Sequence, residues 1–392
     1  MSAPPPPVPE APSWPHCAHG ADPATDPVGC RGVHVSGHTA CLAHLADADR
    51  DAYLAGLTPG ADIDHRGTTF TGPLLNALLG ALRDPNTRHA HFGEARFGSA
   101  TFQSDAWFGS VTFQGDAGFD WATFQGNARF VSATFQGNAW FESATFQGAA
   151  RFESATFQRD ARFAQAVFER WVSLGPFVCA GRVWLSGAVF NGPANLSFAA
   201  RRLECRRTRW LSTAELRLRY ATVDFAHAVF EYPLTIAAEP DPFVLTDGRT
   251  MEEQALAHAP DAAVRIATLR GVDAAHLVLA DVDLSACLFT GTVHLDQLRL
   301  EGACAFDAVP PGTHRRRGRP VRFTGRRTLA EEHHWRAKRP DAVRGWNVAV
   351  LGAGHAGPAQ LAPVYRALRK AFEDGKDEPG AADFYYGEMG AA

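Results

Sequence analysis

The sequence predicts an all-β solenoid, and two observations lead to this fold class. Along residues 92–168, Phe recurs first at steps of five residues and then at alternating steps of six and five, which defines an 11-residue unit. Alanine lies two positions before each of these Phe residues, with Val111 as the single exception. Because side chains at positions i−2 and i point to the same side of an extended segment, each pair predicts a short strand with one inward face. The Phe residues lie at positions 92, 97, 102, 108, 113, 119, 124, 130, 135, 141, 146, 152, 157, 163 and 168.

The spacing of these pairs predicts a coil with four sides. A helix would place apolar residues at intervals of three, four and seven, and no such set recurs here. Each extended segment is only about five residues long, so the chain must turn after each one, and two 11-residue units complete a coil of 22 residues. Phe fills the axis and alanine leaves room for it, as in small barrels that alternate side-chain size. Successive coils stack at the strand spacing of about 4.8 Å, and their open ends need caps.

These Ala-x-Phe pentads resemble the repeats of the pentapeptide-repeat proteins, with Phe where many members carry Leu. The resemblance implies that the coil is a right-handed quadrilateral β-helix. We assign residues 90–170 to this Phe-type β-helix. Weaker pairs of apolar residues continue downstream, so we assign residues 171–314 to a degenerate continuation of the β-helix. Within it, the proline-containing segment 231–262 is expected to loop out.

The outward positions fall into columns that repeat with the coil. β-Branched residues fill two of the columns, which we interpret as structural ladders. The other two columns carry arginine and tryptophan, residue types that dominate binding hot spots, and so predict a partner-binding stripe. The alternative is a solvated face on which long side chains merely cover the ladder beneath them. The predicted stripe consists of Arg96, Trp107, Arg129, Trp140, Arg151 and Arg162.

Residues 14–89 are predicted to form a Cys/His-rich head followed by a helical cap. The head contains three thiols and an imidazole, a donor set that zinc binds tetrahedrally, in Cys17, Cys30, Cys41 and His44. Metal binding would order a segment that has little core of its own, and four protein ligands indicate a structural zinc ion. The alternative is a set of reduced cysteines in an irregular segment. This head is similar to the Cys/His-rich head of actinobacterial pentapeptide-repeat proteins.

Two helical segments are predicted after the head. The first, CLAHLADADRDAYLAGL, begins at Cys41, and the second, PLLNALLGAL, begins with Pro73 in its first turn. Together with residues 61–70 between them, these helices are expected to cap the open end of the coil.

Residues 315–358 are predicted to be a basic linker. Between 315 and 344 there are eleven basic residues against three acidic ones, so the segment could face anionic lipid or an acidic partner, or be a solvated loop. Its end contains GAGHAG, whose glycines have the spacing of a dinucleotide-binding loop. Pro358 and Pro363 follow, and no second strand ending in an acid is found. We therefore expect a flexible linker and no nucleotide site.

Residues 359–392 predict a helical hairpin. The segment resembles the YRxLRKxxEDxKxEPGAADFYYGEM element of actinobacterial pentapeptide-repeat proteins, which in longer relatives leads into transmembrane helices. The resemblance implies either a truncated soluble version of those relatives or a hairpin, residues 361–392, that docks on a separate membrane protein. The first helix has an apolar stripe at helical spacing, formed by Leu361, Val364, Tyr365, Leu368 and Phe372.

Other features limit the compartment and the chemistry. Residues 1–13 are a Pro-rich tail, expected to be disordered, without the basic and apolar regions of a secretory signal. Seven cysteines, an odd number, indicate a reducing compartment, so we expect a cytoplasmic protein that is peripheral at the membrane if its hairpin docks there. No catalytic constellation stands out. The chain is therefore not expected to be an enzyme or to take a small-molecule substrate.

The predicted function is a non-enzymatic scaffold, a protein-interaction module whose partner the sequence does not identify. The alternative follows from the resemblance, because some pentapeptide-repeat proteins imitate duplex DNA and bind type II topoisomerases such as gyrase. That role needs a strongly negative rod, whereas residues 92–168 carry seven acidic and five basic side chains, a net charge of −2. The net charge of the whole chain, −4, provides no global field for direct nucleic-acid binding.

Overall fold

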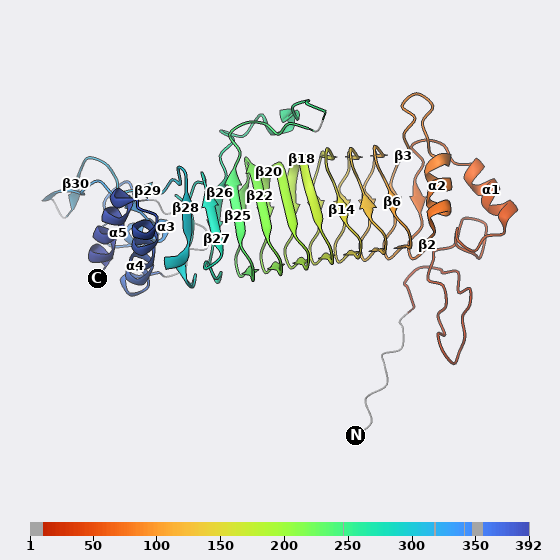
Figure 1. Cartoon of the computed structure of the whole chain (residues 1–392), viewed down its shortest axis with the longest axis horizontal. Coiled ribbons are helices and arrows are strands. Elements are labelled where there is room, and N and C mark those ends of the chain that lie inside the picture. Colours follow the sequence, from red (N-terminus) through yellow and green to blue (C-terminus); the bar gives the residue numbers. More distant parts are fainter. Residues whose placement is uncertain (1–10, 246, 317–318, 341, 347–355, 392) are drawn as a thin grey trace, which may run out of the picture. The chain divides into compact units, whose positions relative to one another are not determined.

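The computed structural model describes residues 11–391 except 246, 317–318, 341 and 347–355. It contains two compact units, Met1–Val172 and Ser173–Ala392, each of which is described by itself. The predicted fold class is confirmed: the repeats form a β-solenoid of about 10 turns, with a few helices near the two ends of the chain (Figure 1). Most of the predicted disordered tail lies outside the described residues.

In the first unit, short parallel strands stack in the register that a 22-residue coil predicts. Arg129 pairs with Trp107 on one side and with Arg151 on the other, each 22 positions away. The sequence period is therefore the period of the coil. The strands are β1 (Ile63–Asp64), β2 (Thr69–Phe70), β3 (His91–Phe92), β4 (Ala95–Arg96), β5 (Thr101–Phe102), β6 (Ala106–Trp107), β7 (Thr112–Phe113), β8 (Ala117–Gly118), β9 (Thr123–Phe124), β10 (Ala128–Arg129), β11 (Thr134–Phe135), β12 (Ala139–Trp140), β13 (Thr145–Phe146), β14 (Ala150–Arg151), β15 (Thr156–Phe157), β16 (Ala161–Arg162) and β17 (Val167–Phe168).

Phenylalanine rings fill the interior of these coils. The rings of Phe119 and Phe141, one coil apart, stack with centroids 5.0 Å apart and an interplanar angle of 3°. Phe130 meets these two rings edge-on, at 5.4 and 5.3 Å. Ring pairs in such geometries add about 0.5–1.5 kcal/mol beyond the area that they bury. Because the rings are almost completely buried, the axis of the coil is a packed aromatic core.

A recurrent turn in each coil requires a left-handed residue. In the turn that begins at Phe97, Ala100 N donates to Phe97 O at 3.0 Å, and Ser99 has a φ of 56°. A positive φ at the third of four residues is the geometry of a type II turn. Serine occupies most of these positions and tryptophan occupies one. The left-handed residues are Ser99, Ser110, Trp121, Ser132, Ser143, Ser154 and Gln165.

The first coil begins earlier in the chain than predicted. Residues 61–70, which we expected to belong to the cap, contain β1 and β2, and Ile63 pairs with Ala95 of β4. This prediction was wrong because α2 (Gly72–Ala81) is inserted between β2 and β3, where it interrupts the 11-residue period. Within the first unit, Figure 1 shows α1 and α2 beside the coil that contains β2 and β3.

Helix α1 (Asp47–Ala55) begins six residues after the predicted start at Cys41. Residues 41–45 form a turn instead, in which His44 N and Leu45 N both donate to Cys41 O, at 2.9 and 3.0 Å. The apolar stripe of the sequence spans both the turn and the helix, and so it does not mark the boundary between them.

A histidine takes the place of a phenylalanine in the first coil. The pairing of β1 with β4 aligns His65 with Phe97, and the imidazole is almost fully buried, with Tyr53 Oη 3.3 Å from Nε2. Burial lowers the pKa of His65 to about 4, since a buried imidazole resists protonation.

The stability of the first unit is therefore expected to fall as the pH is lowered from about 6.5 to about 4. In this window the unfolded chain binds a proton at His65 that the folded chain excludes. The free energy of unfolding therefore falls by about 3 kcal/mol in total. Urea unfolding at pH 7 and pH 5 measures the loss. His65→Phe should reduce it, whereas His89→Gln, at an exposed histidine, should not. An unchanged pH dependence in His65→Phe contradicts the prediction.

The second unit contains longer parallel strands on a shorter coil. Ala194 pairs with Ala214, and Ala214 with Leu234, each step being 20 residues instead of 22. Four sides of five residues each give this 20-residue coil. Its elements are β18 (Val172–Trp184), β19 (Val189–Phe190), β20 (Ala194–Glu204), β21 (Arg209–Trp210), β22 (Ala214–Arg219), β23 (Thr222–Asp224), β24 (Val229–Phe230), β25 (Leu234–Ala238), η1 (Gln254–Leu256), β26 (Arg265–Thr268), β27 (Leu277–Ala280), η2 (Leu295–Gln297) and β28 (Arg299–Glu301).

The chain leaves this solenoid later than predicted. Strand β25 lies within 231–262, the segment that we expected to loop out, and Ile236 pairs with Leu216 on one side and Leu279 on the other. The excursion therefore lies between β25 and β26. Pro233 misled the prediction, because a proline directly before a strand does not interrupt its ladder of hydrogen bonds.

The predicted C-terminal hairpin is confirmed as α4 (Pro358–Asp374) and α5 (Glu378–Ala391). Its apolar stripe faces inward within the second unit. The ring of Phe306, which follows the last coil, packs against Phe372 at 5.7 Å and against Phe384 at 5.1 Å. The hairpin therefore covers the aromatic end of this solenoid, and the stripe is not exposed to a membrane or a partner.

The segment predicted to be a basic linker contains regular structure. It includes the end of β30 (Thr313–Arg316) and all of β31 (Arg319–Arg322), β32 (Arg327–Thr328) and α3 (Ala330–Ala337). Strand β30 pairs with β31, and β32 pairs with β29 (Asp307–Ala308). Glu331 of α3 accepts hydrogen bonds from Phe289 N at 2.6 Å and from Thr290 N at 2.9 Å. Glu331 thus binds backbone donors of the solenoid, a tertiary contact that charge counting does not reveal.

The glycine motif GAGHAG lies largely outside the described residues. Helix α4 begins at Pro358, directly after its last glycine, and includes Pro363. Proline is well tolerated in the first turn, where its missing N–H has no partner to lose. In the described part of the chain, α5 and not a strand follows α4, which is not the order of a dinucleotide fold.

A buried ion pair joins α3 to the hairpin. Glu332 accepts from Arg326 Nη2 at 2.7 Å, from Arg336 and from the hydroxyl of Tyr365. Burial raises the pKa of Glu332, but the charges of the two arginines outweigh it and hold this pKa below its ordinary value.

Glu332→Gln is expected to destabilise the second unit by about 3–5 kcal/mol, because it leaves two partly buried guanidinium groups without their shared carboxylate. Chemical unfolding measures the loss. Glu373→Gln removes the exposed partner of Arg369 and should cost less than about 1 kcal/mol. Equal losses of stability in the two variants would show that the buried ion pair contributes no more to stability than the exposed one.

Candidate metal centre and outer ladders

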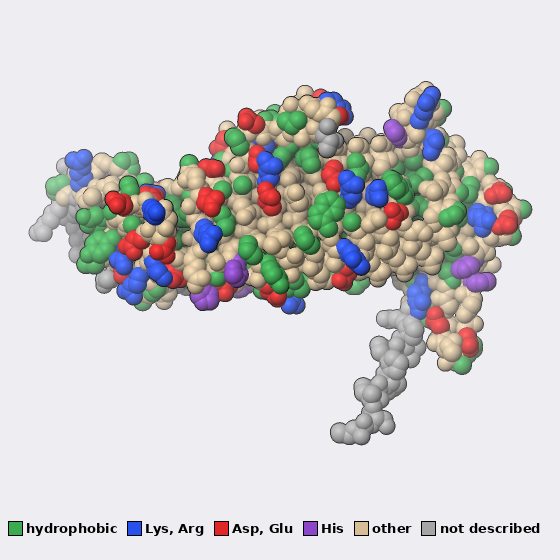
Figure 2. Space-filling view, viewed as in Figure 1, with side chains coloured by type: hydrophobic (Ala, Val, Ile, Leu, Met, Phe, Trp, Pro, Cys, Tyr) green, Lys and Arg blue, Asp and Glu red, His purple; other side chains and the backbone are tan. Residues whose placement is uncertain are grey.

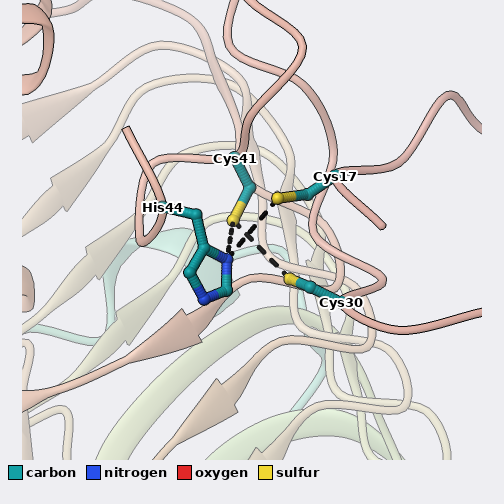
Figure 3. Close-up of side chains that lie close together, drawn as sticks. All are labelled: Cys17, Cys30, Cys41 and His44. Carbon is teal, nitrogen blue, oxygen red and sulfur yellow. Dashed lines mark hydrogen bonds between the residues drawn. The ribbon is translucent and has the colours of Figure 1, made fainter. Parts of the chain in front are cut away.

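Two pieces of local structure bring the predicted metal ligands together (Figure 3). Cys17 and Cys30 lie on paired segments, in which Cys17 N donates to Gly32 O at 2.8 Å and Ala18 N donates to Cys30 O at 2.9 Å. Cys41 and His44 lie on the turn before α1. Gly32 allows the two pieces to approach, since a Cβ at this position would lie 2.6 Å from Cys41 Cβ.

The distances among the four donor atoms fit a tetrahedral ion. All four atoms lie within 4.8 Å of one another. The Sγ atoms of Cys30 and Cys41 are 3.7 Å apart, and His44 Nδ1 lies 3.4 Å from Cys41 Sγ and 3.5 Å from Cys17 Sγ. Zinc bonds of about 2.3 Å to sulfur and about 2.0–2.1 Å to nitrogen give tetrahedral edges of about 3.8 Å for S–S and about 3.6 Å for S–N. The Cys₃His cluster is therefore able to hold a metal ion such as zinc.

The protonation of the thiols agrees with this chemistry. A hydrogen bond from Cys41, together with Gly32 N–H and the nearby imidazole, outweighs burial and lowers the pKa of Cys30 to about 5. The pKa of Cys41 is raised, because its proton is held in the bond to Cys30 and because the side chain is buried. One thiolate is thus available without a metal, and a cation would release the remaining thiol protons.

The other histidines of the head have separate contacts. His34 Nε2 lies 2.7 Å from His16 O, and His38 Nδ1 lies 4.0 Å from a carboxylate oxygen of Asp49. The ring of His19 stacks on that of His44 with centroids 4.2 Å apart. Among the described residues of the head, the close donor group therefore consists of the four predicted ligands.

The residues of the predicted stripe form two ladders. One ladder contains Trp107, Arg129 and Arg151, and the other contains Arg96, Gly118, Trp140 and Arg162. In each, an arginine covers a tryptophan: the Arg129 guanidinium lies 4.0 Å from the ring centroid of Trp107. Every arginine also has an acidic neighbour, in the pairs Arg96–Glu94, Arg129–Asp105, Arg151–Glu153 and Arg162–Glu142. These contacts favour the alternative interpretation, in which the arginines form a solvated face. The role of the stripe in binding a partner stays a prediction.

The acidic residues of the coils have structural partners that the sequence analysis missed. Asp105 Oδ1 accepts the N–H of Asn127 on the next coil at 2.9 Å, and Asp116 Oδ1 accepts that of Asn138 at 2.7 Å. The bond from Asn127 lowers the pKa of Asp105. The 22-residue spacing of these Asp and Asn residues could have revealed them.

The sequence analysis also missed the most exposed aromatic residue of the first unit. Trp121 is 67% exposed, more than Trp107 at 50%. It occupies the left-handed turn position that is serine in five other turns. This departure from the serine column is visible in the sequence, but only once the turn position is known to face outward.

A comparison with protein families agrees with this geometry. The family model described as pentapeptide repeats (9 copies) matches residues 97–142 and 130–175. Residues 97–175 are therefore a pentapeptide-repeat segment. The matched residues are those of the Phe-lined coils, and the Cys/His cluster precedes this pentapeptide-repeat segment. Neither a curated protein nor a solved structure matches the sequence.

Within the described residues, no helix is both long enough and apolar enough to cross a bilayer.

Proposed function

We propose that this chain is a non-enzymatic protein-interaction scaffold whose Cys₃His head holds a structural zinc ion. The exposure of Trp121 is the observation that supports the interaction function. A large aromatic side chain that is 67% exposed contributes little to its own fold, and tryptophan is the residue type most enriched in binding hot spots. The coils around it are packed with Phe rings, so that the solenoid presents its outer side chains on a rigid support.

The donor set supports a structural ion over a catalytic one. Three thiolates and an imidazole fill a tetrahedral site and leave no position open for a substrate or an activated water. The ligands also tie the segment around Cys17 and Cys30 to the turn before α1. A metal at this place would stabilise the head through these cross-links.

The interaction function is tested by capture of partners from the native host, with soluble and membrane fractions processed separately. Trp121→Ser installs the serine found at the same turn position of neighbouring coils, so the fold should be kept. We expect recovery of the partner to fall at least tenfold, as for the loss of a hot spot of 1.4 kcal/mol or more. Ser154→Ala, at the same position of another coil, is the matched control. Undiminished recovery with Trp121→Ser would remove this residue from the interaction.

A second candidate function, attachment to a membrane protein through the C-terminal end, is favoured by the outer face of α5. Tyr385, Tyr386 and Met389 are 46%, 59% and 61% exposed. Deleting 361–392 is a poor test, because it would also uncover Phe306. Tyr386→Ser with Met389→Ser changes only exposed side chains. We expect this double variant to leave the membrane fraction if α5 is the attachment; an unchanged distribution would overturn this candidate.

The competing function, a DNA mimic that acts on gyrase, has weaker support. Acidic and basic side chains are interspersed on the face drawn in Figure 2, and no single sign dominates. Recovery of gyrase subunits from the soluble fraction would nevertheless favour this function over the scaffold.

A further inference from the structure

A notch opens on one face of the first unit where a side chain is missing from a ladder. Gly118 pairs with Arg96 on one side and with Trp140 on the other, so a residue without a side chain lies between two large ones. The resulting hollow has a volume of about 320 Å³. It is lined by Arg66, Glu94, Ala95, Arg96, Gly98, Asp116, Gly118, Asp120 and Trp140.

One wall of the notch is a face of an aromatic ring. Trp140 pairs with Gly118 on one side and with Arg162 on the other. The guanidinium of Arg162 lies 4.3 Å from the ring centroid and covers the ring from its own side. On its other side in the ladder Trp140 is paired with Gly118, and its side chain lines the hollow. The notch is therefore a ladder position at which a cation could stack on tryptophan, as Arg129 does on Trp107.

The charges around the notch favour a cationic occupant. Its two arginines already have acidic partners, since Arg66 binds Asp64 at 2.6 Å and Arg96 binds Glu94 at 2.9 Å. Asp116 and Asp120 stand before and after β8. Within the described part of the chain, neither has a basic side-chain atom within 4.0 Å.

The carboxylate of Asp120 is directed toward the notch. Its Oδ1 accepts the N–H of Glu142 at 3.2 Å, while its Oδ2 lies 3.8 Å from the point where a Cβ on Gly118 would stand. Burial, with the nearby charge of Glu142, raises the pKa of Asp120 above its ordinary value. A cation in the notch would relieve this cost.

We propose that the Gly118 notch binds the guanidinium group of an arginine side chain from a protein partner. Guanidinium is flat and weakly hydrated, so it stacks on an indole and donates to carboxylates in the same plane, whereas an ammonium is compact and strongly hydrated. The proposal rests on the interaction function proposed above and gives the chemistry of its partner. Trp121, the exposed indole of the proposed interaction, directly follows Asp120 in the chain.

The probe for the notch is N-acetyl-arginine amide, added to the full chain with labelled tryptophan. The indole N–H signal of Trp140 is identified among the nine tryptophans by its loss in Trp140→Phe. We expect this signal to shift and saturate with a Kd on the order of 1 mM, as for a single small contact. The citrulline analogue, which has the same shape without the charge, should leave it unchanged. Equal shifts with citrulline, or with the lysine analogue, would overturn the guanidinium assignment.

Two variants separate the notch from the rest of the surface. Gly118→Arg fills the notch from within the chain, and its Cβ fits because the nearest atoms are 3.8 Å away; we expect it to abolish binding of the probe. Gln147→Arg adds the same charge at an exposed position and should bind as the unmodified chain does. Asp116→Asn with Asp120→Asn should weaken the Kd at least tenfold. Probe binding that survives Gly118→Arg overturns the site.

The partner capture described above then distinguishes the two proposals. If Gly118→Arg loses both the probe and the partner, the notch is an anchor of the interaction. If it loses the probe but keeps the partner, the notch is not the partner's site, and the scaffold function stands without it. If the unmodified chain binds the probe but recovers no partner, the interaction function fails by itself.

Discussion

Cys41→Ser is expected to abolish the proposed zinc binding and to disorder the Cys/His-rich head. Cys41 is fully buried, and its Sγ is close to both Cys30 and His44, so its replacement removes a ligand from the centre of the cluster. Structural zinc sites contribute apparent free energies of about 10–16 kcal/mol in small metal-dependent domains, and this head has few other buried side chains. Elemental analysis should find one zinc per unmodified chain and none above background in the variant.

The control for this experiment is Cys304→Ser. Cys304 is also a free cysteine, but it lies outside the cluster, where its thiol donates to backbone carbonyls. It should keep the zinc and the order of the head. Hydrogen exchange of residues 14–45 measures this order, and chelation of the unmodified chain should reproduce the exchange seen in Cys41→Ser. A head that stays protected after chelation would exclude a structural role for the metal.

Phe130→Ala is expected to destabilise the first unit by about 3–5 kcal/mol. Phe130 is fully buried and stacks on Phe108 at 5.0 Å and on Phe152 at 4.9 Å, so its loss leaves a cavity in the middle of the aromatic column. The neighbouring coils hold the backbone in place and limit the collapse that would fill this cavity. Chemical unfolding of the full chain measures the change.

Phe130→Leu separates the loss of volume from the loss of the ring. Leucine fills most of the space and is a residue that such repeats accept, so its cost should be well below that of alanine. Hydrogen exchange should place the effect of both variants in the coils around residue 130, because each coil contacts only its neighbours. Equal destabilisation by leucine and alanine would mean that ring stacking, and not packing volume, holds the column together.

The sequence predicted the metal cluster better than its surroundings. The ligands Cys17, Cys30, Cys41 and His44 could be selected from residue type alone, because zinc limits the choice to thiolates and imidazoles. The spacing alone could not decide which histidine completes the set. The paired segments that bring Cys17 beside the turn at Cys41 form only in the tertiary structure. The notch at Gly118 was not predicted, because a missing side chain leaves a hollow only where its neighbours in the ladder are large, and those neighbours are known only from the structure.

The coil of the first unit could be predicted from the amino-acid pattern alone: its 22-residue period, its Phe interior and the register that stacks Arg129 between Trp107 and Arg151. This was possible because each coil contacts its nearest neighbours, so that a local pattern carries the fold. Two features could be seen only in the folded chain. The inserted α2 sets where the coils begin, and the packing of Phe306 beneath the hairpin sets how the second unit ends. Those features depend on contacts between segments of different periodicity, so they cannot be predicted from the repeat pattern.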